Sequence, residues 1–139
     1  MNKLIAIIAG EPNSINSEII AKAWRKKKNL KKIFIIGNYS ILKKQIFKLG
    51  IKTPLVKINK LEDFKKEKKL YILDVPLKFK SLFNVNSSDT KNYIFKCFYV
   101  AHNLAMNKKI IGFINAPVSK KIFNNKYLGV TEYLANKNK

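Results

Sequence analysis

The sequence has little cysteine, glycine and proline: one Cys, five Gly and four Pro among 139 residues. A single cysteine, Cys97, cannot form an internal disulfide, so no oxidising compartment is indicated and we expect a cytoplasmic protein. With 47% hydrophobic residues, the composition excludes a collagen-like repeat and a chain that is disordered throughout. The length corresponds to about one domain.

Long hydrophobic runs are also missing. No apolar stretch approaches the roughly 20 residues that a bilayer-spanning helix needs. The apolar run at residues 4–9 is short for a signal peptide, and Glu11 and Pro12 follow it, so we interpret it as a buried strand. The sequence therefore predicts no membrane partner.

Acidic residues are scarce, with 8 against 29 basic ones and a net charge of +21. Such a charge is typical of nucleic-acid or anionic-membrane partners. Arg25 is the only arginine, however, and base readout favours the planar guanidinium fork over lysine. We interpret the lysines as coding bias in an AT-rich genome, with surface runs at residues 25–28 and 65–69, and expect no specific nucleic-acid partner. A small basic module that binds polyanions is the alternative.

Strand-like runs alternate with helical patterns along the chain. The predicted strands are at residues 4–9, 32–37, 54–58, 70–75 and 109–114. Helices are expected at 17–29, at 40–49, from a cap at Ser88 or Asp89 to Met106, at 118–123, and from 131 onward. Residues 59–69 are charged and expected to be exposed, and 76–86 irregular. Because most strands are apolar throughout, we predict an α/β fold with a mainly parallel sheet and helices on both faces, a three-layer α/β/α arrangement.

In open parallel sheets, ligands bind beyond the carboxyl ends of the strands, and two loops there are distinctive. Residues 10–18, GEPNSINSE, follow a strand and open a helix, where free N–H groups attract anions. Only Gly10 is glycine, which excludes a phosphate-cradling or dinucleotide loop. Glu11 and Glu18 are candidates for an acid or a ligand; complementation of the helix dipole is the alternative.

The second distinctive region is NAPVSKK at residues 115–121, followed by LGVTEYLA at 128–135. Lys120 could pair with a phosphate, and Thr131 could cap a helix and donate its hydroxyl to a ligand. Plain turn and cap chemistry explains the same residues. His102 is the only histidine, so no histidine cluster for a metal can be assembled, and we expect solvent or a neighbour to satisfy it. Cys97 is expected to be a packed thiol, and no catalytic residue is assigned.

Three motifs occur in a fixed order: Gly10-Glu11-Pro12 with Ile15 and Glu18, then NAPVSK at 115–120, then GVTE at 129–132. In order and spacing they resemble the N-terminal part of the 4-hydroxythreonine-4-phosphate dehydrogenase family, which serves pyridoxal phosphate biosynthesis. The resemblance runs nearly the full chain. It implies that residues 1–139 are the N-terminal part of a two-lobed dehydrogenase with an isopropylmalate-dehydrogenase-like fold, incomplete at the C-terminus.

For the complete enzyme, the resemblance implies a homodimer that oxidises 4-phosphohydroxy-L-threonine with NAD (or NADP) and a divalent metal ion, after which the β-keto acid decarboxylates. The metal ligands and most of the nicotinamide site are expected in the part of the family's chain beyond residue 139. This chain alone is therefore expected to lack the metal and to be inactive.

The resemblance also suggests substrate-binding residues. Thr131 matches a substrate-contacting threonine of the family, Val130 stands where the family has a substrate-contacting histidine, and Lys120 is a further candidate. Valine can neither donate a hydrogen bond nor carry charge, so a diverged member that acts on another phosphorylated hydroxy acid is an alternative. In the first motif, the family's two glycines and proline are replaced by polar residues, namely Ser14, Asn16 and Ser17.

Overall fold

The structure, a computed structural model, describes residues 3–27 and 30–139. Its centre is a sheet of five parallel strands in the order β3-β4-β2-β1-β5. The strands are β1 (Ile5–Ile8), β2 (Ile33–Gly37), β3 (Leu55–Ile58), β4 (Leu70–Asp74) and β5 (Gly112–Asn115). The helices are α1 (Asn16–Lys26), α2 (Tyr39–Lys48), α3 (Ser87–Met106) and α4 (Val130–Lys137), with 3-10 turns η1 (Leu61–Asp63) and η2 (Lys120–Phe123).

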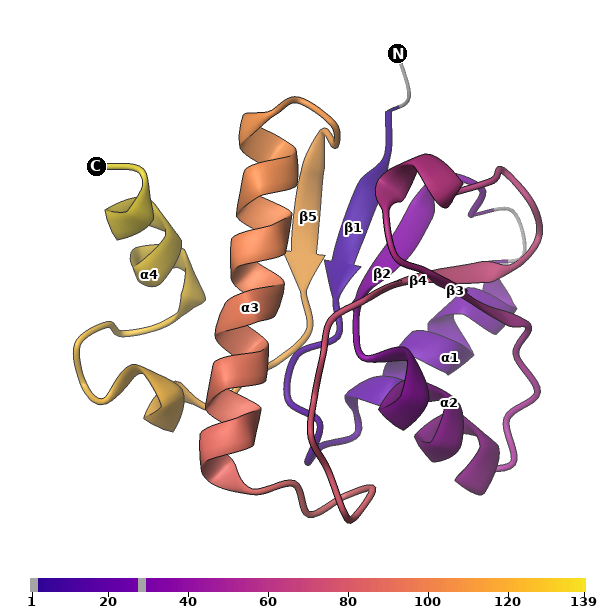
Figure 1. The fold of residues 1–139 in the computed structure, drawn as a ribbon, viewed down its shortest axis with the longest axis horizontal. Helices are drawn as coiled ribbons and strands as arrows, with labels where there is room; N and C mark the ends of the chain where they lie inside the picture. The colour runs from indigo at the N-terminus through magenta and orange to yellow at the C-terminus, as the bar shows by residue number, and fades with distance from the viewer. Residues whose placement is uncertain (1–2, 28–29) are drawn as a thin grey trace.

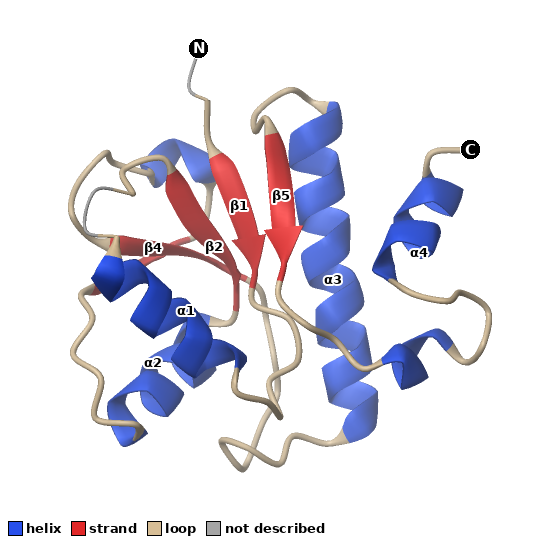
Figure 2. Ribbon diagram, turned by 180° about the vertical axis from the view of Figure 1, so that it is seen from behind, coloured by secondary structure: helices blue, strands red, loops and turns tan. Residues whose placement is uncertain are grey.

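Helices cover both faces of the sheet, as predicted. Helix α3 lies on one side of the strands, and α1 and α2 lie on the other (Figures 1 and 2). Successive strand residues point to opposite faces, so Phe34 and Ile36 of β2 belong to the core under α3, whereas Ile35 packs with α1 and α2. Burial on both faces explains why the strand sequences are continuously apolar instead of alternating.

The long helix α3 differs from the prediction at its start. Asn86 is its N-cap, with an extended backbone and a side chain that accepts a hydrogen bond from the Asp89 N–H at 3.1 Å. The predicted cap at Ser88 or Asp89 is therefore wrong, while the predicted end at Met106 is confirmed. The predicted apolar face is confirmed, and its members are buried or partly buried: Tyr93, Ile94, Cys97, Val100, Ala101 and Leu104.

The charged segments behave largely as expected. Helix α1 ends at Lys26, and the last two residues of the predicted helix, 28–29, lie outside the described residues, as does the end of the lysine run at 25–28. The run at 65–69 is exposed, as predicted. Within residues 59–69, however, η1 turns Phe64 into the core, where its ring centroid lies 5.0 Å from that of Tyr71. The Phe64 side chain therefore packs this segment against the core, a contact that the charged composition of residues 59–69 did not predict.

The C-terminal segment packs against the side of α3 that faces away from the sheet (Figure 1). Strand β5 begins at Gly112, not at the predicted residue 109. The turn η2 begins at Lys120, not at the predicted residue 118, because Ser119 is its N-cap and the Ser119 hydroxyl accepts a hydrogen bond from the Lys121 N–H. Ring centroids 5.1 to 6.1 Å apart join α3 to this segment. The rings belong to Phe95, Phe98, Phe123, Tyr127 and Tyr133.

Candidate functional site

The two distinctive loops of the sequence meet at the carboxyl ends of β1 and β5, which are neighbours in the sheet. The Glu11 N–H donates to the Pro117 carbonyl at 3.3 Å, and the Asn16 side-chain amide donates to the same carbonyl at 2.8 Å. In return, the Ser119 N–H donates to the Glu11 carboxylate at 3.2 Å. Residues 10–16 and 116–119, hereafter the loop pair, therefore form one structural unit at the edge where parallel sheets bind ligands.

Gly10 allows this close approach. Its φ is +74°, in the left-handed region, and a Cβ there would lie 2.7 Å from the Asn16 amide nitrogen. The same Cβ would lie 2.8 Å from the Ala116 carbonyl oxygen and 2.9 Å from that of Pro117. Glycine is the residue that meets both demands without strain or overlap.

Polar side chains hold the first loop where the family has glycine. The Ser14 hydroxyl donates to the Glu11 carbonyl at 2.6 Å and accepts from the Asn16 N–H at 3.1 Å. Asn16 is buried, with 3% of its surface exposed, because its amide reaches across to Pro117. The Glu11 carboxylate is occupied by the Ser119 N–H, and Glu18 lies in the first turn of α1, where it pairs with Lys22. These contacts favour a structural role for both carboxylates.

The three substrate-binding candidates lie on the C-terminal segment. Lys120 is exposed at the start of η2, next to the loop pair, and has no ion-pair partner among the described residues. Val130 is half-buried and packs against the large apolar cluster to which α3 contributes, whereas Thr131 is exposed on α4. The expectation that Thr131 caps a helix is wrong: α4 has Gly129 at its N-cap, and the Glu132 carboxylate accepts from the Leu128 N–H. No hydrogen bond joins Lys120 to Thr131 within the described part of the chain.

The single histidine and the single cysteine are both satisfied within the fold. His102 Nε2 lies 2.6 Å from the Asn138 side-chain oxygen, so of the two expected partners, solvent or a neighbouring side chain, the structure shows a neighbour. Cys97 is fully buried, and burial raises the pKa of its thiol to about 12, which confirms a packed thiol. Across residues 3–27 and 30–139, no group of three or more His, Cys, Asp and Glu is placed to hold a metal ion. The described residues therefore do not fit the divalent metal that the resemblance implies.

A second polar network, beside the loop pair at the same edge of the sheet, was missed by sequence reasoning. Asp74, the last residue of β4, accepts from the Tyr39 N–H at 2.8 Å and pairs with Lys57 at 3.1 Å. Asn38, directly after β2, donates its side-chain amide to the Val75 carbonyl at 2.9 Å and caps α2. A polar residue that ends an apolar run is the signal that could have identified both.

The sequence matches one family model, described as pyridoxal phosphate biosynthetic protein PdxA, over residues 29–139. A search of curated proteins found no match. Among the described residues, no helix is both long and apolar enough to cross a membrane.

Several solved structures share the fold, and two of them illustrate the similarity. A 4-hydroxythreonine-4-phosphate dehydrogenase from Burkholderia phymatum superposes with a TM-score of 0.84 at 21% identity, over 98% of this chain and 43% of that one. The corresponding protein from Klebsiella pneumoniae superposes with a TM-score of 0.80 at 23% identity, over 98% of this chain and 44% of that one. This chain thus spans less than half the length of the solved structures that it resembles.

Proposed function

The chain belongs to the family of pyridoxal phosphate biosynthetic protein PdxA, and on that premise we propose that it is the N-terminal part of a dehydrogenase acting on 4-phosphohydroxy-L-threonine. The complete enzyme would oxidise the secondary alcohol with NAD (or NADP) and a divalent metal ion, as a cytoplasmic homodimer. Residues 1–139 would contribute part of the substrate-binding lobe.

The observation that carries the proposal is the loop pair. Its contacts join residues 101 and 108 positions apart in the sequence, so two of the three family-like motifs meet at one edge of the sheet. The Glu11 carboxylate fixes the Ser119 N–H, which orients the chain immediately before Lys120. From there, the Lys120 ammonium would pair with the substrate phosphate as a point charge, and the exposed hydroxyl of Thr131 would donate a hydrogen bond.

Neither the metal nor NAD (or NADP) is assigned to residues of this chain. The described residues offer no metal-ligand set, and both groups are proposed to bind mostly to the part of the family's chain beyond the matched 43–44%. The isolated 139-residue chain is therefore proposed to bind substrate weakly and to be catalytically inactive.

A chimera tests the activity. This chain replaces the matching 44% of the Klebsiella pneumoniae protein, and NADH formation is measured with 4-phosphohydroxy-L-threonine, NAD and a divalent metal ion. We expect NADH, and we expect Thr131→Ala to raise KM by roughly tenfold, the cost of about one hydrogen bond to a charged group. Asn136→Ala on the same helix is the control for local stability: it removes a 2.8 Å hydrogen bond to the Tyr127 hydroxyl but no proposed substrate contact, and it should leave KM unchanged.

The chimera's folding is checked by circular dichroism, and substrate binding to the 139-residue chain is measured separately by NMR. A folded chimera without NADH would refute the proposed activity. If the chimera does not fold, the NMR titration decides, because a chain that shows no shifts at Lys120 or Thr131 with millimolar substrate does not supply the substrate site.

The side chain of Val130 favours a second candidate, a family member that acts on another phosphorylated hydroxy acid. Val130 packs against the core and can offer substrate neither a hydrogen bond nor a charge. A screen of phosphorylated hydroxy acids with the chimera and its Val130→His variant separates the two. If Val130→His raises the activity on 4-phosphohydroxy-L-threonine, the first proposal is supported. If the chimera prefers another phosphorylated hydroxy acid and Val130→His abolishes its activity on that compound, the second is supported.

A further inference from the structure

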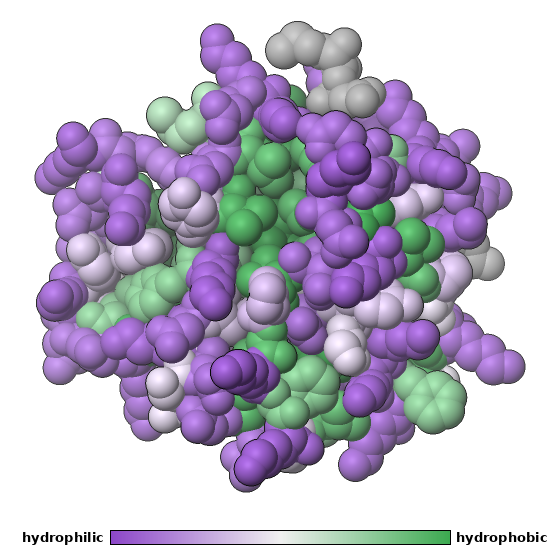
Figure 3. Space-filling model, in the orientation of Figure 1, coloured by the Kyte–Doolittle hydropathy of each residue, from purple (hydrophilic) through white to green (hydrophobic). Residues whose placement is uncertain are grey.

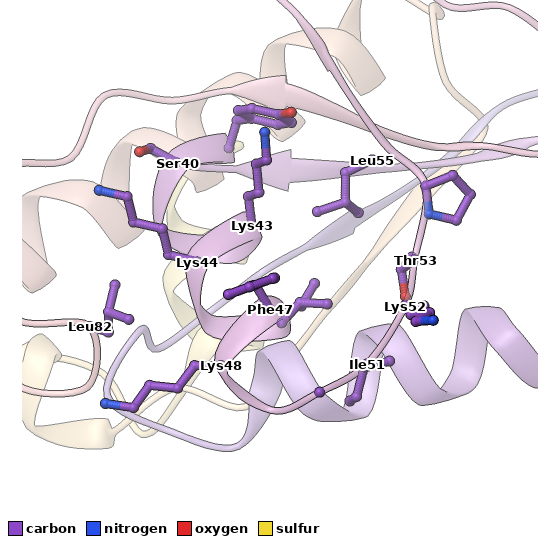
Figure 4. Close-up of a pocket in the computed structure, with 14 residues that line it drawn as sticks. Ser40, Lys43, Lys44, Phe47, Lys48, Ile51, Lys52, Thr53, Leu55 and Leu82 are labelled. Carbon is purple, nitrogen blue, oxygen red and sulfur yellow. The ribbon is translucent and has the colours of Figure 1, made fainter.

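A cavity of about 1180 Å³ lies between α2 and the segment that leads into β3, and it includes no residue of the loop pair. Figure 4 shows Phe47 in its centre, with Ile51 and Leu55 on one side and Leu82 on the other. The volume lies just above the range of about 300–1,000 Å³ that is usual for small-molecule sites. Its apolar side chains favour a ligand with a mainly apolar body.

The cavity is held open by contacts that do not depend on a ligand. The side-chain amide of Gln45, 1% exposed, donates to the Pro12 carbonyl at 2.8 Å and to the Leu82 carbonyl. Gln45 thereby fixes the wall that Leu82 provides. On the other side of the cavity, Gly50 turns the chain after α2 with a φ of +69°. The next residue, Ile51, is 9% exposed and packs in the core. The hollow is therefore a feature of the folded chain.

Positive charge surrounds the cavity without a counter-charge. Lys43, Lys44, Lys48 and Lys52 line it, no acidic residue does, and within the described residues none of the four has an ion-pair partner. The Lys43 ammonium lies 5.5 Å from the ring centroid of Tyr39, and the Lys44 ammonium lies 5.5 Å from that of Phe79, so aromatic faces hold both charges beside the cavity. In Figure 4, Lys44 and Lys48 extend towards the side where Leu82 lies.

Phe47 shows that the apolar surface is not fully covered. Its side chain is 84% exposed to solvent, and full burial of a phenylalanine side chain stabilises by roughly 1.5–3 kcal/mol relative to exposure. A space-filling view from the side of α3 shows most exposed surface as hydrophilic, with apolar side chains confined to limited patches (Figure 3). An apolar ligand body would cover Phe47 at little conformational cost, because the remaining walls are already in place.

We propose that this cavity binds a long-chain carboxylate, with the alkyl chain against Phe47, Ile51 and Leu55 and the carboxylate between Lys44 and Lys48. These two lysines are four residues apart on α2 and so lie on one face of the helix, about 6 Å apart at their Cβ atoms. An acidic amphipathic helix is a poorer match, because ten-residue α2 provides a wall of only about 15 Å, too short for three turns of a docked helix. The site is independent of the proposed dehydrogenase function.

Titration of the ¹⁵N-labelled 139-residue chain with dodecanoate below its micelle concentration tests the proposal. We expect saturable one-site binding, with amide shifts confined to α2, residues 49–55 and Leu82. Lys48→Glu should weaken binding by roughly fivefold or more, the effect of about 1 kcal/mol from a surface charge. Lys96→Glu makes the same charge change at an exposed position of α3 and should leave dodecanoate binding unchanged.

The apolar contact has its own matched pair. Phe47→Ser removes a side chain that is 84% exposed, so the fold should tolerate it while dodecanoate binding weakens. Tyr99→Ser, at a position 68% exposed on α3, is the control and should have no effect. Decanol tests the head group: it should bind more weakly than decanoate and be indifferent to Lys48→Glu.

Three results would overturn the proposal. The first is binding of dodecanoate that does not saturate. The second is an equal loss of dodecanoate affinity in the cavity variants and in their controls. The third is a set of amide chemical-shift changes at Phe47 and Ile51 that an acidic amphipathic peptide produces and dodecanoate does not. The last result would identify the cavity as a protein-docking groove.

Discussion

Replacing Gly10 by alanine tests whether the loop pair is a single unit. The added Cβ meets the Asn16 amide nitrogen at 2.7 Å and two carbonyl oxygens at 2.8 and 2.9 Å, all of them within the loop pair. Backbone atoms cannot rotate away as the end of a flexible side chain can. The substitution must therefore separate the two loops or unfold one of them.

The magnitude follows from three contributions. An alanine at φ +74° costs roughly 1–2 kcal/mol, and loss of the Asn16–Pro117 hydrogen bond about 1 kcal/mol. Overlap with the backbone adds strain of order 1–3 kcal/mol, so the free energy of unfolding should fall by about 3–6 kcal/mol. Two other glycines calibrate this figure. Gly50 has a similar φ of +69° but open space around its Cβ position, so Gly50→Ala should cost only the roughly 1–2 kcal/mol of the backbone conformation. Gly129 is extended, with open space as well, so Gly129→Ala should fall within about 0.5 kcal/mol of the wild type.

Urea denaturation followed by circular dichroism measures the series. With an m-value of about 2 kcal/mol/M, Gly10→Ala should lower the denaturation midpoint by roughly 1.5–3 M and Gly50→Ala by roughly 0.5–1 M. If Gly10→Ala costs no more than Gly50→Ala, the two loops do not touch as described, and the argument for a shared site at β1 and β5 fails. In the folded fraction of Gly10→Ala, the amide signals of Glu11 and Ser119 should both shift, because one hydrogen bond joins them.

Three further predictions concern buried groups and net charge. Burial raises the pKa of the Cys97 thiol to about 12, so the folded state retains a proton that the unfolded state loses above pH 9. The free energy of unfolding should therefore fall by up to about 1.4 kcal/mol per pH unit between pH 9 and 12. In Cys97→Ala, the dependence of this free energy on pH should be weaker. Thr90 is buried on α3, and its hydroxyl has no hydrogen-bond partner among the described residues. Thr90→Val should therefore leave the free energy of unfolding unchanged or raise it by about 1 kcal/mol. A fall of more than about 1 kcal/mol would mean that the hydroxyl is hydrogen-bonded. The net charge of +21 should produce duplex DNA binding at low salt that disappears at moderate salt, and binding that persists with sequence selectivity would revive the basic-module alternative.

The sheet was predictable from sequence because its inner strands β2 and β4 are buried on both faces and are therefore apolar almost throughout. The ends of β2 at Gly37 and β3 at Ile58 coincide with the predicted ends, since a turn residue or a charged run follows each apolar run. Helix ends that depend on distant contacts were less predictable. Asn13 makes two 2.7 Å hydrogen bonds with the backbone of Val85, and Val85 is buried, so the chain enters α3 at the next residue, Asn86. The local sequence Asn-Ser-Ser-Asp offers four possible caps and cannot choose among them.

The candidate site was predictable only in part, for a related reason. Two motif loops at the carboxyl ends of strands were expected, but their contact depends on β1 and β5 being neighbours, which no local pattern fixes. The position of Val130 depends on aromatic packing between α3 and residues 123–133, again a long-range property. Thr131 was expected to cap a helix because of its residue type, yet the helix starts one residue earlier, at Val130.

The differences from the family's first motif also have a physical explanation in the loop pair. Gly10, the one position of that loop with a positive φ and a crowded Cβ direction, is still glycine. Where the resemblance places the other two glycines, Ser14 and Asn16 stand instead, and both use their side chains to bond the loop, Ser14 within it and Asn16 across to Pro117. A glycine backbone loses more entropy on folding than one with a side chain, so these substitutions exchange flexibility for specific hydrogen bonds. Asn16→Gly should therefore loosen the loop pair more than Ser14→Gly does, because it alone removes the bond to Pro117, and faster hydrogen exchange at the Glu11 and Ser119 amides in Asn16→Gly is the result that this reasoning requires.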